Sequence, residues 1–308
     1  MNSTIQSNFR AWDSPVYQQT ALIVIAVIFI GALINYFFRT KNQYSQVAWA
    51  SIKSWLIFAP LMFGIMGLSY PTPFLLLTVL ALFGAKIYFQ IMGMFHKHYF
   101  VYICYLGIVG LAACAYYDNL TIYNEMPMAV LGLSCLVPLI QRDYKNMIQY
   151  ISLTLLGFIF LGWSFMHLGL ILNFDNGIYQ VMYVIILTEF CDNTNLSLSR
   201  YFRGERILAE ISQRRTFLST VVSILLTVAL AYGMRHLLPA RGDKYWLASG
   251  LVAGFGGVIG DLVMSVIRKD AGVKTVGPFI LGRGDFLQRM DRLIFVAPIY
   301  YFVMLAIK

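Results

Sequence analysis

Residues 21–34 read ALIVIAVIFIGALI, inside a longer stretch, residues 17–38, that contains no charged side chain. The hydrocarbon core of a bilayer is crossed by roughly 20 apolar residues in an α-helix. In lipid a spanning segment must satisfy its own backbone hydrogen bonds, and a helix does so. The stretch is too long for a signal-peptide core, and no small-residue cleavage site follows it. Residues 17–38 therefore predict a retained membrane-spanning helix.

Comparable apolar stretches recur along the whole chain. Of its 308 residues, 59% are hydrophobic and 12% are charged, which is too apolar for a soluble domain. A β-barrel would show alternating apolar and polar residues instead. We expect an all-α, polytopic transmembrane helical bundle of about 9–10 spans, forming a single integral membrane domain over residues 1–308. The spans are expected near residues 17–38, 49–69, 72–95, 99–117, 122–140, 147–173, 178–190, 216–234, 245–266 and 293–307.

Basic residues are divided unevenly between alternate loops. Cytoplasmic loops of membrane proteins collect Lys and Arg. With ten spans, 17 of the 23 Lys and Arg residues fall on one side and five on the other, and Lys86 lies inside the third span. This partition predicts that both termini lie outside and that the basic loops are cytoplasmic. The net charge of +9 then needs no nucleic acid partner, and anionic headgroups or nucleotides are the natural ligands.

Polar side chains suited to chemistry gather in two segments, residues 188–219 and 255–293. In the second, Asp261, Ser265 and the pair Arg268 and Lys269 are spaced to lie on one face of a helix. A carboxylate, a hydroxyl and two cations in line can hold a metal ion and the phosphates it bridges. Alternatively, Asp261 pairs with a basic residue to lock helices together.

The first segment offers a second set of oxygen ligands. Glu189, Asp192 and Asn193 are expected at the cytoplasmic end of the seventh span. Carboxylates of this type suit Mg²⁺, which takes one or two of them and leaves positions for phosphate and water. Asp192 and Asp261 come from different helices on the same side, so the two could share one metal ion. Alternatively, they are ordinary helix-end acids exposed to headgroups.

Two further patterns have competing interpretations. Hydroxyl and guanidinium donors precede the eighth span, and they suit either phosphate oxygens or a positive-inside anchor: Ser212, Arg214, Arg215 and Thr216. A glycine row favours close helix packing over a phosphate-binding loop: Gly250, Gly254, Gly256, Gly257 and Gly260.

Residues 190–292 resemble the signature regions of the CDP-diacylglycerol synthase (phosphatidate cytidylyltransferase) family. The matching positions are Cys191-Asp192 with Arg200 and Phe202; Ser212 to Thr216; and Gly260-Asp261-Leu262, Ser265, Arg268-Lys269, Ala271 to Lys274, Gly277, Gly282, Gly284 and Arg289-Met290-Asp291. A long spaced motif of this kind is more specific than any single piece of it. The chain departs from the family pattern at Arg214-Arg215, Thr275, Arg283, Asp285 and Gln288, as a divergent member would.

The resemblance implies an enzyme that joins CTP to a phosphatidate-like lipid, giving a CDP-lipid and pyrophosphate for phospholipid biosynthesis. It implies that Asp192 and Asp261 hold Mg²⁺, with or without a monovalent cation beside it. The implied catalytic residues are Asp192, Asp261, Lys269 and Asp291. The implied substrate-binding residues are Arg200, Ser212, Arg215, Thr216, Ser265, Arg268, Lys274 and Arg289. It also implies a homodimer in a bacterial inner membrane, with the site facing the cytoplasm.

Two other functions stay open. A small-solute transporter also places ionisable residues in a helical bundle, but it favours the bilayer midplane and internal repeats, whereas these charges cluster at one face. A catalytically inactive relative acting as a membrane scaffold would keep the fold and account for the departures from the motif.

Overall fold

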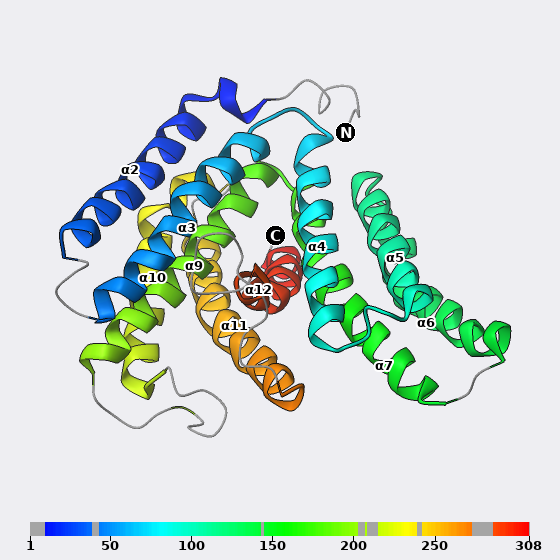
Figure 1. Ribbon diagram of the computed structural model, residues 1–308. Helices are drawn as coiled ribbons and strands as arrows, with labels where there is room; N and C mark the ends of the chain where they lie inside the picture. Colours follow the sequence, from blue (N-terminus) through cyan, green and yellow to red (C-terminus); the bar gives the residue numbers. More distant parts are fainter. Residues whose placement is uncertain are drawn as a thin grey trace. The chain divides into compact units, whose positions relative to one another are not determined.

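The computed structural model describes residues 10–38, 43–142, 145–202, 207, 215–238, 242–272 and 286–307. Within these ranges the regular structure is helical and no β-strand occurs, as the composition predicted (Figure 1). The chain divides into two compact units. The first comprises Met1–Leu76 and Thr275–Phe286, and the second comprises Leu77–Lys274 and Leu287–Lys308.

In the first unit two long helices pack together, α2 (Pro15–Phe38) and α3 (Gln43–Met66). Polar side chains near the start of the chain fasten this pair. The Tyr17 hydroxyl donates to the carbonyl oxygen of Phe63 at 2.7 Å. The Trp12 indole nitrogen donates to the carbonyl oxygen of Gly64 at 3.1 Å. The apolar stretch that predicted the first span is therefore a single helix held against its neighbour.

The second unit holds most of α4, the helices from α5 to α11, and α12 from Leu287 onward; Figure 1 labels these helices. α7, the π-helical segment η2 and α8 run on from one another as one helix over residues 147–171. The bounds are α4 Thr72–Ile91, α5 His98–Tyr116, α6 Leu120–Gln141, α7 Met147–Gly157, η2 Phe158–Ser164, α8 Phe165–Ile171, α9 Gly177–Tyr201, α10 Phe217–Gly233, α11 Asp243–Asp270 and α12 Phe286–Ile307.

Within the described ranges, ten long helices stand at the ten predicted positions, and seven are long and apolar enough to cross a membrane. These seven are Pro15–Ile34, Thr72–Ile91, His98–Tyr116, Leu120–Gln141, Met147–Ile171, Asp243–Asp270 and Met290–Ile307. Two shorter apolar helices, Trp55–Met66 and Phe217–Gly233, fall within α3 and at α10. Together these helices indicate an integral membrane protein.

Two helices extend beyond the predicted spans into polar sequence. The seventh span was expected to end at residue 190, but α9 continues to Tyr201; the tenth was expected to begin at 293, but α12 begins at Phe286. Hydropathy ends a span where polar residues begin. Here these side chains have partners inside the bundle: the Asn195 amide donates to the Thr220 hydroxyl at 2.9 Å and accepts from the Ser219 hydroxyl at 2.8 Å. Satisfied polar groups allow the helix to continue.

Glycines let α11 approach two neighbouring helices. A Cβ built on Gly250 would lie 2.9 Å from the Cα of Val228 on α10. One on Gly256 would lie 3.1 Å from Val296 on α12, and one on Gly260 would collide with the backbone carbonyl of Asp291. Close approach of this kind is the usual role of small residues in membrane helices. The packing interpretation of the glycine row is therefore the one that the structure supports.

We expect Gly260→Ala to lower the free energy of unfolding by about 1–3 kcal/mol, because the methyl group overpacks the contact between α11 and α12. Thermal unfolding in detergent micelles measures the effect. Gly132→Ala on α6 is the matched control, because a Cβ there meets no atom within 4 Å. It should unfold at the same temperature as the wild type or slightly higher. Equal losses in both variants would contradict the packing account.

Candidate functional site

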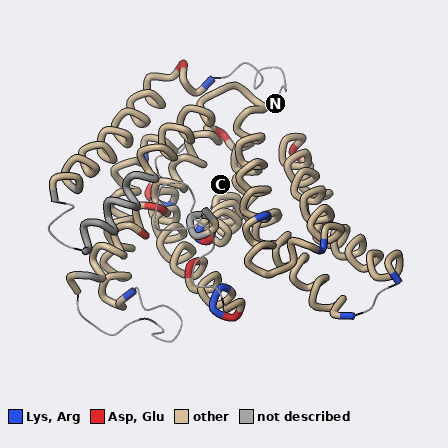
Figure 2. Tube along the Cα trace, in the orientation of Figure 1, with Lys and Arg blue, Asp and Glu red and all other residues tan. Residues whose placement is uncertain are grey.

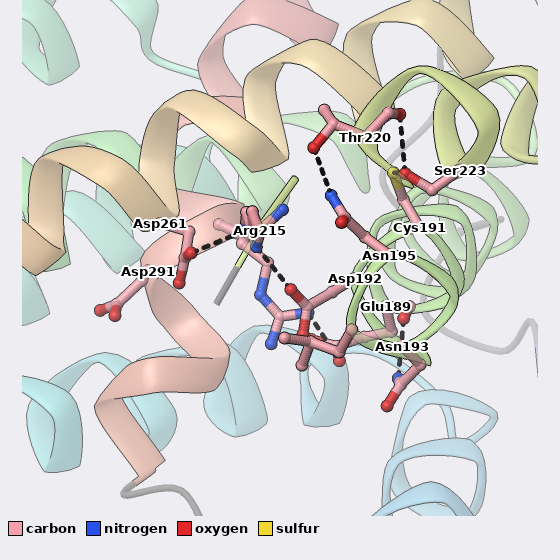
Figure 3. Close-up of polar contacts among 12 residues, drawn as sticks. Glu189, Cys191, Asp192, Asn193, Asn195, Arg215, Thr220, Ser223, Asp261 and Asp291 are labelled. Carbon is pink, nitrogen blue, oxygen red and sulfur yellow. Dashed lines mark hydrogen bonds and ion pairs between the residues drawn. The ribbon is translucent and has the colours of Figure 1, made fainter. Parts of the chain in front are cut away.

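Two carboxylates from different helices meet on one buried guanidinium (Figure 3). Asp192 lies on α9, Asp261 lies on α11, and Arg215 lies just before α10. The Arg215 Nη2 is 2.6 Å from Oδ1 of Asp192, and its Nε is 3.0 Å from Oδ2 of Asp261. Arg215 is only 2% exposed. The structure therefore brings the two predicted metal ligands together, and the cation that both contact is an arginine side chain.

A second arginine joins the same cluster from α12. The Arg292 Nη1 lies 3.1 Å from Oε2 of Glu189 and 3.1 Å from Oδ2 of Asp192. Asp192 thus contacts one arginine through each carboxylate oxygen. Arg292 was not among the predicted site residues, because it counted only as a cytoplasmic loop charge. The missed signal was its place at the head of an apolar run, where an ionised side chain requires a partner.

Five ionisable side chains meet in the described part of this cluster. Three carboxylates, those of Asp192, Asp261 and Glu189, face two guanidinium groups, and all five residues are between 2% and 8% exposed. Buried charges of this kind persist only when they are paired and hydrogen-bonded. Figure 2 shows how sparse charge is along the helices and how acidic and basic positions come together around α9, α11 and α12.

Two other predicted residues form a separate ion pair beside the cluster. The Arg268 Nη2 lies 2.6 Å from Oδ2 of Asp291, which is fully buried. Arg268 stands in the last turn of α11, and Asp291 stands near the start of α12. In this structure the pair links α11 to α12 at the helix ends that the charge partition predicts to be cytoplasmic. The catalytic role of Asp291 and the substrate-binding role of Arg268 stay predictions.

The two predicted hydroxyls that the structure describes bond to the backbone. Thr216 is the N-cap of α10, and its side chain accepts a hydrogen bond from the backbone nitrogen of Ser219 at 3.3 Å. The Ser265 hydroxyl donates to the carbonyl oxygen of Asp261, one turn earlier, at 2.6 Å. The N-cap holds the start of α10 directly after Arg215, so Thr216 helps to position that guanidinium. Lys269 is exposed near the end of α11.

The remaining predicted positions are not described in full. Ser212, Arg214 and Lys274 lie outside the described residues, as do three of the departures from the motif, Thr275, Arg283 and Asp285. Three more residues belong to helices whose backbone is described while their side chains are not: Arg200, Gln288 and Arg289.

The two aspartates can bind a hard divalent cation such as Mg²⁺ if substrate phosphates supply further ligands. In the part of the chain that the structure describes, no group of three or more His, Cys, Asp or Glu residues could hold a metal ion. Mg²⁺, however, is commonly bound by one or two carboxylates together with substrate phosphates rather than by an all-protein cage. Asp192 and Asp261 could supply those carboxylates. Arg215 contacts one oxygen of each aspartate, so a metal ion that used those two oxygens would displace the guanidinium.

Comparisons with known proteins give one matching family model and several similar proteins. A model described as "Cytidylyltransferase family" matches residues 49–307. The chain is 28% identical over 130 residues to "Uncharacterized protein YnbB" of Escherichia coli, covering 42% of this chain and 44% of that protein. It is 27% identical over 149 residues to the phosphatidate cytidylyltransferase of Bacillus subtilis, covering 47% and 55%. Against the Synechocystis phosphatidate cytidylyltransferase the identity is 44% over 66 residues, covering 20% and 22%. The matched stretches thus span about half or less of these relatives.

We expect Arg292→Met to destabilise the protein by about 3–5 kcal/mol, because it leaves Glu189 and Asp192 facing each other without their shared cation. Glu189→Gln removes one of these charges, so the double variant should recover part of the loss, with a coupling energy of about 0.5–3 kcal/mol. Unfolding in denaturant, followed by tryptophan fluorescence, measures the cycle. Glu125→Gln, on the exposed face of α6, is the control partner and should be additive with Arg292→Met. An additive result for Glu189→Gln would refute the proposed coupling.

Proposed function

The chain belongs to the cytidylyltransferase family, and we propose that it transfers the cytidylyl group of CTP to the phosphate of a phosphatidate-like lipid. The products are a CDP-lipid, used in phospholipid biosynthesis, and pyrophosphate. The observation that carries the proposal is the convergence of Asp192 and Asp261 on Arg215 inside the helical bundle, where α11 is long and apolar enough to cross a membrane. Similarity to proteins named phosphatidate cytidylyltransferases supports the choice of a lipid phosphate as acceptor.

In this reaction the protein positions the substrates and stabilises their negative charge, and it forms no covalent bond with them. An oxygen of the lipid phosphate attacks the α-phosphorus of CTP, and the bond from that phosphorus to the oxygen bridging to the β-phosphate breaks. Bound Mg²⁺ would neutralise the nucleotide phosphates and assist the departure of pyrophosphate. The attacking phosphate is already an anion, so no strong general base is required. Consistent with this, the four histidines lie outside the two signature segments: His96, His98, His167 and His236.

Arg215 has two sets of anions available to it in this scheme. In the structure its guanidinium neutralises Asp192 and Asp261 together. A guanidinium binds phosphate oxygens with the same forked geometry as it binds carboxylates. We propose that Arg215 moves from at least one aspartate to a substrate phosphate when the metal–nucleotide complex binds. Asp192 and Asp261 would then be the residues that hold Mg²⁺, and Arg215 would bind a phosphate oxygen of the substrate.

The remaining cations are proposed to bind the substrates at the same membrane boundary. Lys269 is exposed at the end of α11, and Arg268 is held close by through Asp291. A site at the cytoplasmic boundary lets the lipid headgroup reach these residues while the acyl chains stay in the bilayer. CTP then enters from the aqueous side. Placement in a bacterial inner membrane and a homodimeric state belong to the same proposal.

Purified protein should incorporate radiolabelled CTP into chloroform-extractable lipid when phosphatidate and Mg²⁺ are present. Asp192→Asn and Asp261→Asn should lower the rate by about 100-fold or more, because each removes a charge expected to bind the metal ion. Asp243→Asn is the matched control: this residue lies at the opposite end of α11, and its carboxylate accepts from the Trp246 indole. Its rate should equal that of the wild type.

Three outcomes would count against the proposal. If the wild-type protein labels no lipid across a panel of phospholipid acceptors, the enzymatic function is rejected and the inactive-scaffold function is favoured. A wild-type protein that labels no lipid but moves a solute across liposomes would support a transporter. Full activity in both Asp192→Asn and Asp261→Asn would also reject the assigned site.

The exchange of Arg215 can be tested without turnover. Arg215→Gln should bind Mn²⁺, a spectroscopic substitute for Mg²⁺, about 10- to 100-fold more tightly than the wild type in the absence of nucleotide, because two charge-assisted hydrogen bonds no longer compete. Electron paramagnetic resonance of free Mn²⁺ measures the affinity. Arg235→Gln, at the far end of α10, should bind as the wild type does. Weaker Mn²⁺ binding by Arg215→Gln would refute the exchange.

A further inference from the structure

Helix α4 has two faces with different surroundings. One face is buried against the bundle: a Cβ on Gly84 would lie 2.7 Å from the sulfur of Met290 on α12. On the same face, the Tyr88 hydroxyl donates to the carbonyl oxygen of Leu153 on α7 at 3.1 Å. Met290 belongs to α12, the helix that also carries Arg292 of the candidate site. What lies on the other face of α4 is therefore separate from that site.

The other face of α4 borders a groove shared with α5, its neighbour in Figure 1. The groove has a volume of about 580 Å³, within the range of small-molecule sites. Each helix contributes four side chains at i, i+3, i+4 and i+7 spacing, so each wall of the groove is one face of a helix. The lining residues are Val79, Leu82, Phe83 and Lys86 from α4, and Tyr102, Tyr105, Leu106 and Val109 from α5.

One cation stands in this otherwise apolar and aromatic groove. Lys86 is exposed, and it lies within the membrane-spanning helix Thr72–Ile91. An ionised side chain inside a span is costly unless it has a partner or reaches water. Among the described residues, no carboxylate pairs with Lys86. A ligand that brings an anion into the groove would supply the missing partner.

The position of Lys86 along α4 sets the depth of that anion. Lys86 precedes the end of the helix at Ile91 by five residues, a rise of roughly 8 Å. The connection after α4 carries Lys97, which the charge partition assigns to the cytoplasmic side. The ammonium group can therefore extend to the headgroup layer of the inner leaflet while the rest of the groove stays at the depth of the acyl chains.

We propose that the groove between α4 and α5 binds an anionic phospholipid, with one acyl chain along the apolar walls and the headgroup phosphate at the ammonium group of Lys86. Charge complementarity selects the ligand. A lipid with a net negative charge compensates the lysine, whereas a zwitterionic lipid brings a cation of its own. The groove is separate from the candidate site, so the proposal goes beyond the cytidylyltransferase reaction and survives if that reaction is disproved.

Native mass spectrometry of the purified full-length protein tests the proposal. The protein is released from mixed micelles that contain equal amounts of phosphatidylglycerol and phosphatidylcholine, and the bound lipids are counted. The wild type should retain phosphatidylglycerol preferentially. Lys86→Gln should reduce that preference about fivefold, the factor expected for one lysine at an anionic surface. Leu106→Trp should lower the occupancy of both lipids, because the indole fills the groove.

Two controls separate the groove from general charge effects. Lys97→Gln removes a cation from the same side of the membrane, but Lys97 lies over the Tyr150 ring, 4.8 Å from its centroid, and not in the groove. It should keep the wild-type preference. Excess inorganic phosphate should not displace the lipid, because it has no acyl chain. The proposal is overturned if Lys86→Gln keeps the wild-type preference, or if Lys97→Gln loses as much.

Discussion

The fold depends on the need to pair charges that are buried among apolar helices. Asp192 and Asp261 cannot enter a helical bundle ionised unless a cation enters with them. Arg215 meets that need for both, with contacts of 2.6 Å and 3.0 Å. The pairing links Arg215, directly before α10, to α9 and α11. It also explains why the polar end of α9 remains helical: its acidic residue is compensated inside the protein.

The second group of contacts depends on how closely α11 and α12 approach. Gly260 allows the backbone of α12 to lie against α11 at Asp291. At that separation Arg268 reaches Asp291 from one helix, and Arg292 reaches Glu189 and Asp192 on α9 from the other. A larger residue at 260 would separate the helices and weaken both sets of ion pairs. The close packing of α11 against α12 and the ion pairs near their contact therefore depend on each other.

The groups that stabilise the bundle are the same groups that the proposed reaction uses. Arg215, Asp192 and Asp261 satisfy one another in the structure, and in the proposed function each exchanges a protein partner for a substrate or a metal ion. Such an arrangement keeps the charges paired before the substrate arrives. Lys86 differs, because it stands in the α4–α5 groove away from this cluster. Lipid contact and the proposed chemistry thus use different faces of the same unit.

Hydropathy and residue spacing alone predicted that the chain is a helical membrane protein and where its ten long helices lie. They offered a metal ion shared by Asp192 and Asp261 as one of two interpretations. These features depend on local composition and on helical periodicity, which a sequence displays directly. Only the tertiary structure decided that α9 reaches Tyr201, that Arg215 bridges the two aspartates and that Arg292 joins them. Arg215 and Asp261 are 46 positions apart in the sequence, and Arg292 and Glu189 are 103 positions apart. No local pattern specifies which of several basic residues becomes the buried partner, because helix packing makes that choice.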